Sequence, residues 1–273
     1  MQRTINSFDK TKINYNISRH SKEFLIFIHG AGGDLSAWNK ERTYFHRKGI
    51  STLAIDLRGH GKSERPNKLE DYQLAKFAKD INEIIKKENI KKFIIVGHSF
   101  GGVITIKFHE LFPKKSKAYI LIATTHKSPK SIKKMFKQKG FVNLINKFLS
   151  KTSSKKGSHV DFNKFVGTKD YSPRRILSDI THTSFKSWFF TYQSISDFNL
   201  TKSLNKMKQS VLIIEGEKDS IFKVPVAKKM HKLLKHSKLD IIPKANHMIV
   251  INNPKAIKKE ILEFIKKQKF PIQ

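Results

Sequence analysis

The pentapeptide at residues 97–101, Gly-His-Ser-Phe-Gly, places a serine between two glycines in a G-x-S-x-G pattern. An apolar run at residues 93–96 comes directly before it, and a helical pattern follows until Pro113. A strand, a sharp turn and a helix in this order would lift the Ser99 hydroxyl above the sheet edge. The first amides of the helix would stabilise negative charge at the same point. The pattern therefore predicts that Ser99 is a nucleophile.

A serine hydroxyl is a poor nucleophile at neutral pH, so it needs a base within hydrogen-bond reach. The chain has twelve histidines. His247 is the best placed of them, because it lies in a loop between the last expected strand and the last expected helix. His98 adjoins the serine in sequence, but we expect its side chain to point away from that of Ser99. The prediction is that His247 is the base.

A third group must hold the base in the correct tautomer. The segment at residues 216–219, Gly-Glu-Lys-Asp, follows the penultimate core strand and offers Asp219 for this role. Glu215 and Glu217 are the alternatives. The strand before the lysine-rich region ends without a carboxylate, which removes the other plausible position. We therefore expect Asp219 to orient His247.

Short apolar runs that alternate with helical patterns form the elements that must position these residues. Connections too long for hairpins are typical of a mostly parallel sheet with helices on both faces, and ligands bind such sheets at the carboxyl ends of the strands. The N-terminal residues 2–8 and 11–17 read instead as a hairpin. The expected strands are residues 24–28, 52–55, 93–96, 118–123, 211–214 and 239–242, and the expected helices are residues 36–48, 72–87, 103–111, 225–235 and 254–268. Five polar residues that follow strands should meet at one rim, namely His29, Asp56, Ser99, Asp219 and His247.

Residues 124–203 interrupt this alternation, because they are lysine-rich and helix-like and contain no buried-strand pattern. We interpret them as a helical insertion that divides the core into residues 1–123 and 204–273. Aromatic side chains gather at Trp188, Phe189, Phe190 and Tyr192. Our expectation is that Trp188 and Phe189, together with His29, line an apolar substrate pocket above the serine. Packing inside the insertion is the alternative explanation of the cluster.

The formal net charge is +33, from 55 Lys and Arg against 22 Asp and Glu. Such an excess raises the question of polyanion binding. The charge is spread along the chain, however, and no RNA-binding aromatic motif accompanies it. We expect no specific nucleic-acid partner, and only weak adhesion to anionic surfaces.

The chain contains no cysteine, which excludes disulfides and a thiolate zinc site. We expect neither a metal nor a cofactor, and a small, hydrophobic ester as the substrate. The N-terminus lacks the apolar core of a secretory signal, and the longest uncharged stretch is too short to span a bilayer. We therefore expect a soluble, cytoplasmic protein, and the oligomeric state stays open.

Two glycine-rich segments are rival candidates for a phosphate-binding loop. The segment at residues 29–33, His-Gly-Ala-Gly-Gly, fits neither G-x-G-x-x-G nor G-x-x-x-x-G-K-[ST]. The segment at residues 61–63, Gly-Lys-Ser, resembles the end of a P-loop, but Asp56 stands where its first glycine would be. For the charged loop at residues 56–63, we favour a holding role of Asp56 and Arg58 over a catalytic one.

The motifs HGAGGD, DLRGHGKS, GHSFGG, GEKD and NHM, in this order, make the sequence similar to the α/β-hydrolase fold superfamily over almost the whole chain. The resemblance implies a mostly parallel, eight-stranded α/β-hydrolase sheet with helices on both faces and a helical cap at residues 124–203. It also implies the chain order serine, aspartate, histidine, and an oxyanion hole formed by the backbone amides of Ala31 and Phe100. A serine in place of an aspartate nucleophile disfavours the haloalkane dehalogenase and epoxide hydrolase branches.

The functional hypothesis is a serine hydrolase that cleaves a carboxylic ester, thioester or lactone through an acyl-enzyme. A protein that only binds a small molecule on the same fold is an alternative from a different class. Hydrolysis of C–C bonds, acyl transfer and cofactor-free haloperoxidase-like reactions also remain open, because a fold does not determine a function.

Overall fold

The computed structural model describes residues 1–154 and 157–270. The strands are β1 (Gln2–Asn6), β2 (Lys12–Ser18), β3 (Glu23–Ile28), β4 (Ser51–Ile55), β5 (Lys92–His98), β6 (Ala118–Ile122), β7 (Ser210–Gly216) and β8 (Ser237–Ile242). They form one eight-stranded sheet in the order β1-β2-β4-β3-β5-β6-β7-β8. β2 runs antiparallel to β1 and β4, and the other neighbours are parallel. The expected fold class, a mostly parallel eight-stranded sheet, is confirmed.

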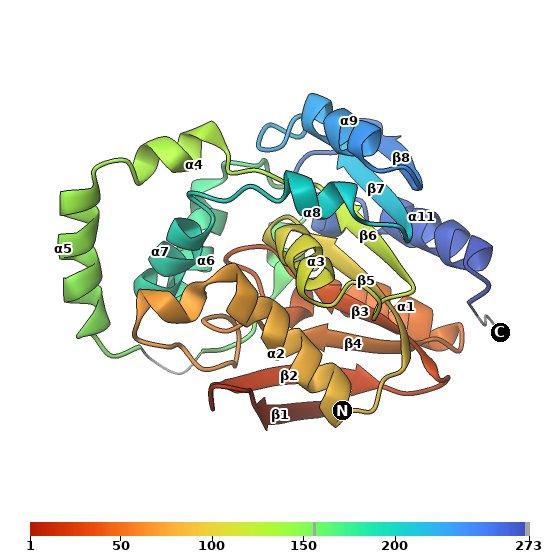
Figure 1. The fold of residues 1–273 in the computed structure, drawn as a ribbon, viewed down its shortest axis with the longest axis horizontal. Helices are drawn as coiled ribbons and strands as arrows, with labels where there is room; N and C mark the ends of the chain where they lie inside the picture. Colours follow the sequence, from red (N-terminus) through yellow and green to blue (C-terminus); the bar gives the residue numbers. More distant parts are fainter. Residues whose placement is uncertain (155–156, 271–273) are drawn as a thin grey trace.

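Helices cover both faces of this sheet (Figure 1). The core helices are α1 (Asn39–Arg47), α2 (Leu74–Lys87), α3 (Phe100–Leu111), α8 (Thr201–Asn205), α9 (Val224–Leu233), α10 (Ile249–Asn252) and α11 (Pro254–Lys267), and η1 (Leu35–Trp38) and η2 (Leu69–Tyr72) are single 3₁₀ turns. α2, α3 and α9 contribute to one buried apolar cluster, and α1 and α11 contribute to the other. None of the helices in the described ranges is long and apolar enough to cross a bilayer.

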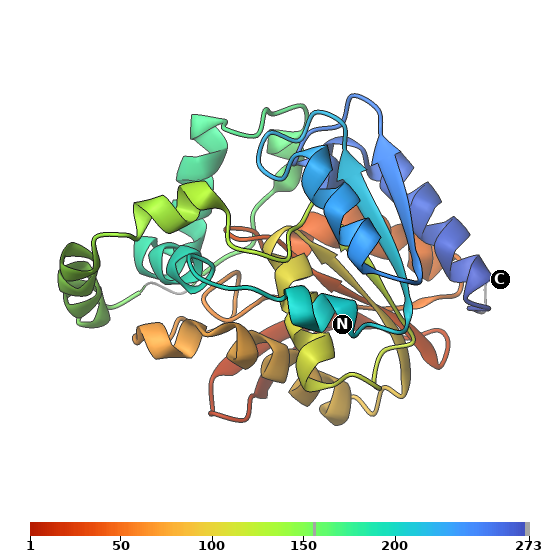
Figure 2. The ribbon, with the colours of Figure 1, turned by 45° about the horizontal axis from the view of Figure 1, so that its top comes forward.

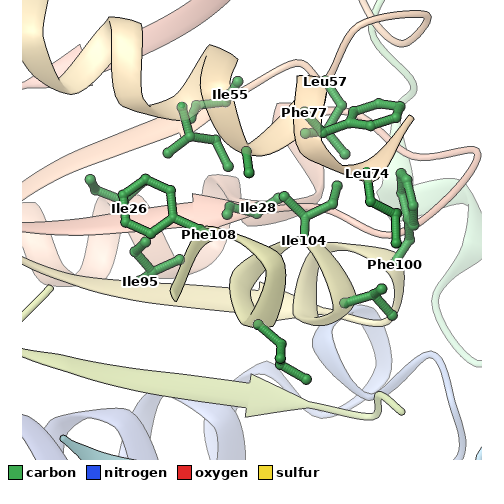
Figure 3. Close-up of a cluster of buried hydrophobic side chains, with 14 of the residues drawn as sticks. Ile26, Ile28, Ile55, Leu57, Leu74, Phe77, Ile95, Phe100, Ile104 and Phe108 are labelled. Carbon is green, nitrogen blue, oxygen red and sulfur yellow. The ribbon is translucent and has the colours of Figure 1, made fainter. Parts of the chain in front are cut away.

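The central strands are apolar throughout because they are buried on both faces. Every residue of β3 is buried, and successive side chains enter opposite layers. Ile26 and Ile28 belong to the cluster under α2 and α3, whereas Phe27 belongs to the cluster under α1. Figure 3 shows the first of these layers, in which Ile104 and Phe108 of α3 lie over the sheet.

Between β6 and β7, the 124–203 segment forms α4 (Lys130–Met135), α5 (Lys139–Ser150), η3 (Phe162–Phe165), α6 (Pro173–Thr183) and α7 (Phe185–Ser194). These helices lie together at one side of the sheet in Figures 1 and 2. α8 crosses the expected boundary at residue 203 and packs on α3 and α9 of the core. Two stretches of the expected domains, residues 155–156 and 271–273, lie outside the described residues.

Buried polar contacts hold the 124–203 segment against the core. The Arg65 guanidinium donates to the backbone oxygens of His182 and Thr183, at 2.6 and 2.9 Å. The Tyr72 hydroxyl lies 2.8 Å from Ser187 Oγ on α7. Both contacts start from the chain between β4 and α2, so the loop after β4 supports the helices that follow β6.

Arg58 holds that loop in place from inside the protein. Its side chain is fully buried, and its guanidinium lies 2.7 Å from Asp80 Oδ1 on α2 and 3.0 Å from Asp9 Oδ2 in the β1–β2 turn. Asp80 is itself only 2% exposed. Removal of one partner would leave a buried charge without compensation.

We expect Arg58→Ala to lower the free energy of unfolding by about 3–5 kcal/mol, because the Asp80 carboxylate would remain buried without its cation. Urea unfolding measures this change. Lys86→Ala is the matched control, since Lys86 pairs with Glu83 at the surface and such pairs contribute about 0–1 kcal/mol. Equal losses in the two variants would show that the Arg58 cluster has no special structural role.

Candidate active site

Ser99 lies at the turn between β5 and α3 in a backbone conformation that side chains rarely adopt, with φ of 53° and ψ of −117°. Glycines make the turn possible. A Cβ atom on Gly97 would lie 2.4 Å from Gly101 O, and one on Gly101 would lie 2.3 Å from Ile28 O. The backbone of α3 therefore passes directly over β5 and β3, which leaves the Ser99 hydroxyl at the carboxyl end of the sheet.

The structure brings His247 to this hydroxyl. His247 Nε2 lies 3.0 Å from Ser99 Oγ, although the two residues are 148 positions apart. The other ring nitrogen, Nδ1, lies 2.7 Å from Asp219 Oδ2. Serine, histidine and aspartate thus form one continuous series of hydrogen bonds, from the ends of three different strands. A proton on Nδ1 would leave Nε2 free to accept from the serine.

Asp219 is held as a carboxylate by several donors. Its Oδ1 accepts hydrogen bonds from the amides of Ile221 and Phe222, at 2.7 and 2.8 Å. Burial by itself would raise the pKa of Asp219, but the hydrogen bond and the charge of His247, together with the Phe222 amide, lower this pKa to about 2. Asp219 is therefore ionised at neutral pH and can stabilise a positive charge on the imidazole.

The two alternative carboxylates lie elsewhere. Glu217 is exposed, and its Oε2 accepts from the Lys244 amide at 2.8 Å. Glu215 is fully buried at the end of β7. Burial, together with the nearby charge of Asp219, raises the pKa of Glu215 to about 10, so this side chain is neutral at pH 7. Of the three acids, Asp219 is the one that contacts the histidine ring.

The backbone of His247 is fixed at both of its polar atoms. Its amide donates to Asp170 Oδ1 at 2.8 Å, and its carbonyl oxygen lies 3.0 Å from His98 Nε2. The other Asp170 oxygen accepts from both the amide and the hydroxyl of Ser220, at 2.9 and 2.6 Å. One buried carboxylate of the 124–203 segment therefore joins the loop of Asp219 to the loop of His247.

Further contacts join the same two parts of the chain. The side-chain nitrogens of Asn246 and Asn252 both donate to Thr168 O, at 2.9 and 3.1 Å. The Gly167 amide donates to Asn252 Oδ1 at 2.8 Å. Residues 167–170 are thus bonded both to the loop that carries the histidine and to the end of α10, so the position of that loop depends on the segment between β6 and β7.

The His98 ring lies beside that of His247, with ring centroids 5.3 Å apart. It is one of the residues that line the cavity described below. Burial, together with the charge of His247, lowers the pKa of His98 to about 3, so the ring is neutral and donates from Nε2 to the His247 carbonyl. Its contact is with the His247 backbone, and it leaves the Ser99 hydroxyl to the His247 ring.

Two backbone amides are free near the serine. Within residues 1–154 and 157–270, no protein acceptor receives the amide hydrogen of Ala31 or of Phe100. Phe100 is the first residue of α3, where amides have no partner inside the helix. Both residues line the same cavity as Ser99. This arrangement suits an oxygen atom that gains negative charge.

His29 stands at the end of β3 with both ring nitrogens in use. The Leu57 amide donates to His29 Nε2 at 3.1 Å, so Nδ1 carries the proton and donates to Gly30 O at 2.8 Å. Burial lowers the pKa of His29, which favours this neutral form. The side chain borders the cavity, and its hydrogen bond with the Leu57 amide joins β3 to the loop after β4.

The cavity above Ser99 has a volume of about 100 Å³. Its floor contains Ser99, His247, Ala31 and Phe100. Apolar side chains from the 124–203 segment make much of its wall, namely Pro129, Ile132, Phe162, Tyr192, Ile195 and Phe198. The site is thus a small, mainly apolar space in contact with the serine hydroxyl.

One ion pair interrupts this apolar wall. Arg175 and Asp179, one turn apart on α6, pair through Nη1 and Oδ2. Burial, with a smaller contribution from Asp34, raises the pKa of Asp179 to about 7, and Arg175 opposes that rise. Arg175 Nη2 also donates to the backbone oxygen of Asp170, at 2.9 Å.

The structure corrects the expectation that Trp188 and Phe189 line the pocket. Among the described residues, Tyr192 is the member of that aromatic cluster that borders the cavity. Phe189 packs edge-on against Phe136, with ring centroids 5.2 Å apart, and the Trp188 ring lies 4.5 Å from that of Tyr192. Residues 188 and 192 are one helical turn apart on the same side of α7, so the Trp188 ring packs along the Tyr192 ring, while Phe189 packs on Phe136.

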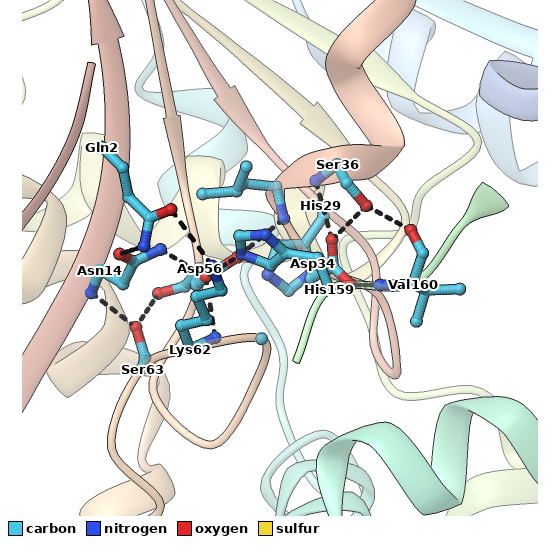
Figure 4. Close-up of polar contacts among 12 residues, drawn as sticks. Gln2, Asn14, His29, Asp34, Ser36, Asp56, Lys62, Ser63, His159 and Val160 are labelled. Atoms are coloured by element: carbon cyan, nitrogen blue, oxygen red, sulfur yellow. Dashed lines mark hydrogen bonds and ion pairs between the residues drawn. The ribbon is translucent and has the colours of Figure 1, made fainter. Parts of the chain in front are cut away.

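A second polar cluster, shown in Figure 4, lies beside the site. Potential ligand atoms of Asp34, Asp56 and His159 lie within 4.8 Å of one another, so these residues could in principle bind a metal ion. Each carboxylate oxygen already accepts from protein donors, however. Asp34 accepts hydrogen bonds from the amides of Ser36 and Val160. Asp56 accepts hydrogen bonds from Asn14 Nδ2, from the amides of Leu35 and Lys62, and from His159 Nε2. The cluster therefore fits a structural tie between the loops after β3 and β4 and the 124–203 segment.

Comparison with known proteins identifies the family of this chain. The model of a protein family described as the alpha/beta hydrolase fold matches residues 23–254. The chain belongs to this family. Within the α/β-hydrolase fold, the matched range runs from β3 to the start of α11 and contains all the residues of the site described above.

Among the similar proteins, Protein ABHD8 of Bos taurus is 38% identical over 87 residues, which are 32% of this chain and 20% of that protein. The match thus spans about a fifth of the relative. An esterase from Exiguobacterium antarcticum superposes with a TM-score of 0.77 at 18% identity, over 97% of this α/β-hydrolase chain and 100% of the other. An enol-lactonase from Burkholderia xenovorans LB400 gives 0.76 at 17% identity, over 97% and 100%. At these identities the superpositions show the shared fold.

Asp170 is the residue of the site that sequence reasoning missed. It lies between η3 and α6 in a segment without hydrophobic periodicity, and its partners are 50 and 77 positions away. A lone aspartate in a lysine-rich region carries no local signal of such a role. Only the folded chain shows that its carboxylate joins the two loops.

We expect Asp170→Asn to slow the modification of Ser99 by an organophosphorus reagent by about 10- to 100-fold, because small displacements of reacting groups cost rate of this order. The Asp170 carboxylate accepts hydrogen bonds at both of its oxygens. In an asparagine, one of these oxygens is replaced by an NH₂ group, which is itself a donor and cannot accept. Asp161→Asn is the matched control, since Asp161 is exposed and its side chain accepts from the amide of Asn163, two residues away. The labelling rate is measured well below the unfolding temperature of each variant. A normal rate in Asp170→Asn would contradict the positioning role.

Proposed function

We propose that this protein hydrolyses a carboxylic ester, thioester or lactone through an acyl-enzyme on Ser99. The observation that carries this proposal is the hydrogen-bonded series from Ser99 Oγ through the His247 ring to Asp219, with contacts of 3.0 and 2.7 Å. The two free amides beside the serine, at Ala31 and Phe100, support it. Membership in the α/β-hydrolase family is consistent with it.

In the first half-reaction, Ser99 Oγ attacks the carbonyl carbon while His247 Nε2 takes the hydroxyl proton. The carbonyl oxygen becomes negative and accepts hydrogen bonds from the amides of Ala31 and Phe100. Collapse of this intermediate breaks the bond to the leaving oxygen or sulfur, which receives the proton from His247. The acyl group is then bound to the serine.

In the second half-reaction, a water molecule attacks the acyl carbon and gives a proton to His247. The bond from carbon to Ser99 Oγ breaks, the proton returns to the serine, and the carboxylic acid leaves. Asp219 orients the imidazole and stabilises its positive charge in both halves. Its low pKa keeps it ionised throughout, whereas the neutral Glu215 nearby adds no second negative charge.

The size and the lining of the cavity favour a substrate whose acyl group, the part next to Ser99, is small and apolar. Its volume of about 100 Å³ is below the range of roughly 300–1,000 Å³ typical of sites for drug-sized ligands. The 124–203 segment acts in this proposal as a cap that bounds the space from above. Because Asp179 partly neutralises Arg175, the wall offers no isolated charge to an anionic acyl group.

Two of the proteins of similar fold are named an esterase and an enol-lactonase, and these names are consistent with the proposed chemistry. A protein that only binds its ligand on the same scaffold is the alternative. Turnover of a panel of p-nitrophenyl esters separates the two hypotheses, because a binding protein would release no nitrophenol.

We expect Ser99→Ala and His247→Ala each to lower kcat for the best ester of the panel by at least about 10³-fold. The reason is that Ser99→Ala removes the attacking hydroxyl and His247→Ala removes the group that transfers its proton. Unfolding curves that overlap with those of the unchanged protein serve as the control for folding.

The carboxylates provide the sharper comparison in the same assay. Asp219→Asn should lower kcat by about 10²- to 10⁴-fold, since the amide would favour the wrong tautomer of His247. Glu217→Gln should leave kcat within about twofold, because Glu217 is exposed and its Oε2 accepts from the Lys244 amide rather than from the His247 ring. Full activity in Ser99→Ala, or greater damage from Glu217→Gln, would refute the mechanism.

Acyl-chain selectivity tests the cavity. Tyr192→Ala should shift the preference from short toward longer acyl chains, because Tyr192 borders the space above the serine. Trp188→Ala is the matched control, and we expect it to lower thermal stability without a change in that preference. The measurement is the ratio of kcat/KM for p-nitrophenyl butyrate and octanoate. An unchanged ratio in Tyr192→Ala would show that this wall does not select the substrate.

A further inference from the structure

α5 exposes an apolar face that the enzyme core leaves uncovered. Phe141, Leu144 and Phe148 lie three and four residues apart, so they share one side of the helix, and they are 63%, 66% and 69% exposed. Val142 and Leu149 of the same helix are buried against the rest of the protein. α5 lies at the outer margin of the molecule in both Figure 1 and Figure 2. The exposed face thus points away from the core.

Exposed lysines are frequent in α4, in α5 and in the residues next to them. Residues 127–151 contain eight lysines and no aspartate or glutamate. All of these lysines are exposed, namely Lys127, Lys130, Lys133, Lys134, Lys137, Lys139, Lys147 and Lys151. Lys133 pairs with Asp197 at 3.1 Å, but both partners are largely exposed, so this contact neutralises little of the charge. α4 and α5 together therefore form a strongly cationic surface with an apolar ridge.

We propose that α5 docks on an anionic lipid surface, with Phe141, Leu144 and Phe148 inserted between the headgroups. An amphipathic helix with aromatic and aliphatic residues on one side and lysines beside them has the composition of an interfacial helix. Each lysine near a negatively charged membrane adds attraction within a Debye length. The proposal stands on the surface of α4 and α5 and is independent of the proposed ester hydrolysis.

Charge decides between a membrane and the other occupants of an apolar helix face. A second copy of this chain would bring another net charge of +33 to the interface, and like charges disfavour such contacts. A soluble polyanion would pair with the lysines but would leave the three apolar side chains in water. An anionic bilayer satisfies both, because it offers negative headgroups and an apolar interior at the same surface.

The position of α4 connects this surface to the cavity. Pro129 and Ile132, at and within the first turn of α4, line the space above Ser99. Phe136, which follows α4, packs on Phe189 of α7. If α5 docks on a bilayer, the bilayer surface would therefore lie next to the helices that form the wall of the cavity. Hydrophobic molecules dissolved in that bilayer would be close to the site.

Sedimentation with lipid vesicles tests the proposal. The full-length protein should bind vesicles of phosphatidylcholine with about 30% phosphatidylserine, and should bind pure phosphatidylcholine at least about tenfold more weakly. The triple variant Phe141→Ser, Leu144→Ser, Phe148→Ser should raise the apparent Kd for the anionic vesicles by about tenfold or more. Because these three side chains are exposed, the triple variant should unfold at the same denaturant concentration as the unchanged protein.

A charge-matched pair of variants separates local from net charge. Lys133→Gln, Lys134→Gln and Lys137→Gln together should weaken binding strongly. Lys228→Gln, Lys229→Gln and Lys232→Gln, on the exposed side of α9, remove the same three charges and should weaken it only slightly. Ester turnover in solution should be unchanged in both sets, so failure of this proposal is distinct from failure of the proposed function.

Three results would overturn the proposal. Equal binding to pure phosphatidylcholine would remove the role of charge. Unchanged binding of the triple serine variant would mean that charge alone causes the adhesion, as for any soluble polyanion. Equal losses in the two lysine sets would mean that net charge, and not the surface of α4 and α5, attracts the vesicles.

Discussion

The contact between the backbones of α3 and β3 is the constraint on which the site depends. Gly101 approaches Ile28 so closely that a Cβ atom would lie 2.3 Å from the Ile28 oxygen. This close approach forces the turn at Ser99 into its unusual backbone conformation. Such a strained conformation persists only because the packing around it holds the backbone in place. The apolar layer between α3 and the sheet, with Ile104 on the helix and Ile26 and Ile28 on β3, supplies packing on one face, so the hydrophobic core and the Ser99 hydroxyl are parts of one arrangement.

The second requirement of the site is a fixed histidine, and the sheet alone does not meet it. His247 follows β8, the edge strand, whose side chains are only partly buried. The contacts of its backbone with Asp170 and His98 compensate for this position. Ring geometry relative to Ser99 and Asp219 therefore depends on a carboxylate from outside the sheet, and rigidity at the edge of the core comes from the segment between β6 and β7.

The sequence predicts the parts of the site that have local signatures. Ser99 sits in a pattern that only a strand, a tight turn and a helix satisfy, and His247 and Asp219 follow strands whose apolar runs are easy to recognise. The parallel sheet then brings the carboxyl ends of these strands to one edge, so residues that are far apart in the sequence lie close together in the structure. The fold class could be predicted for the same reason, since strands buried on both faces alternate with amphipathic helices.

Residues in the 124–203 segment were harder to place, because no sheet determines which way its helices face. An aromatic cluster at residues 188–192 indicates burial but does not distinguish the cavity wall from the packing behind it, and Tyr192 rather than Trp188 or Phe189 borders the cavity. The acids could be separated only by geometry, since Glu215, Glu217 and Asp219 lie within five residues and face different environments.

The bonds of Asp170 have a consequence for how this fold can be recombined. A segment that supplies part of the support for His247 is not a separable module, even though it is inserted between two core strands. Exchange of residues 124–203 with the corresponding segment of another α/β-hydrolase would replace one wall of the cavity above Ser99, and would also remove the carboxylate that joins the loops after β7 and β8. Changes of specificity by segment exchange are therefore linked, in this chain, to changes in how firmly the histidine is held.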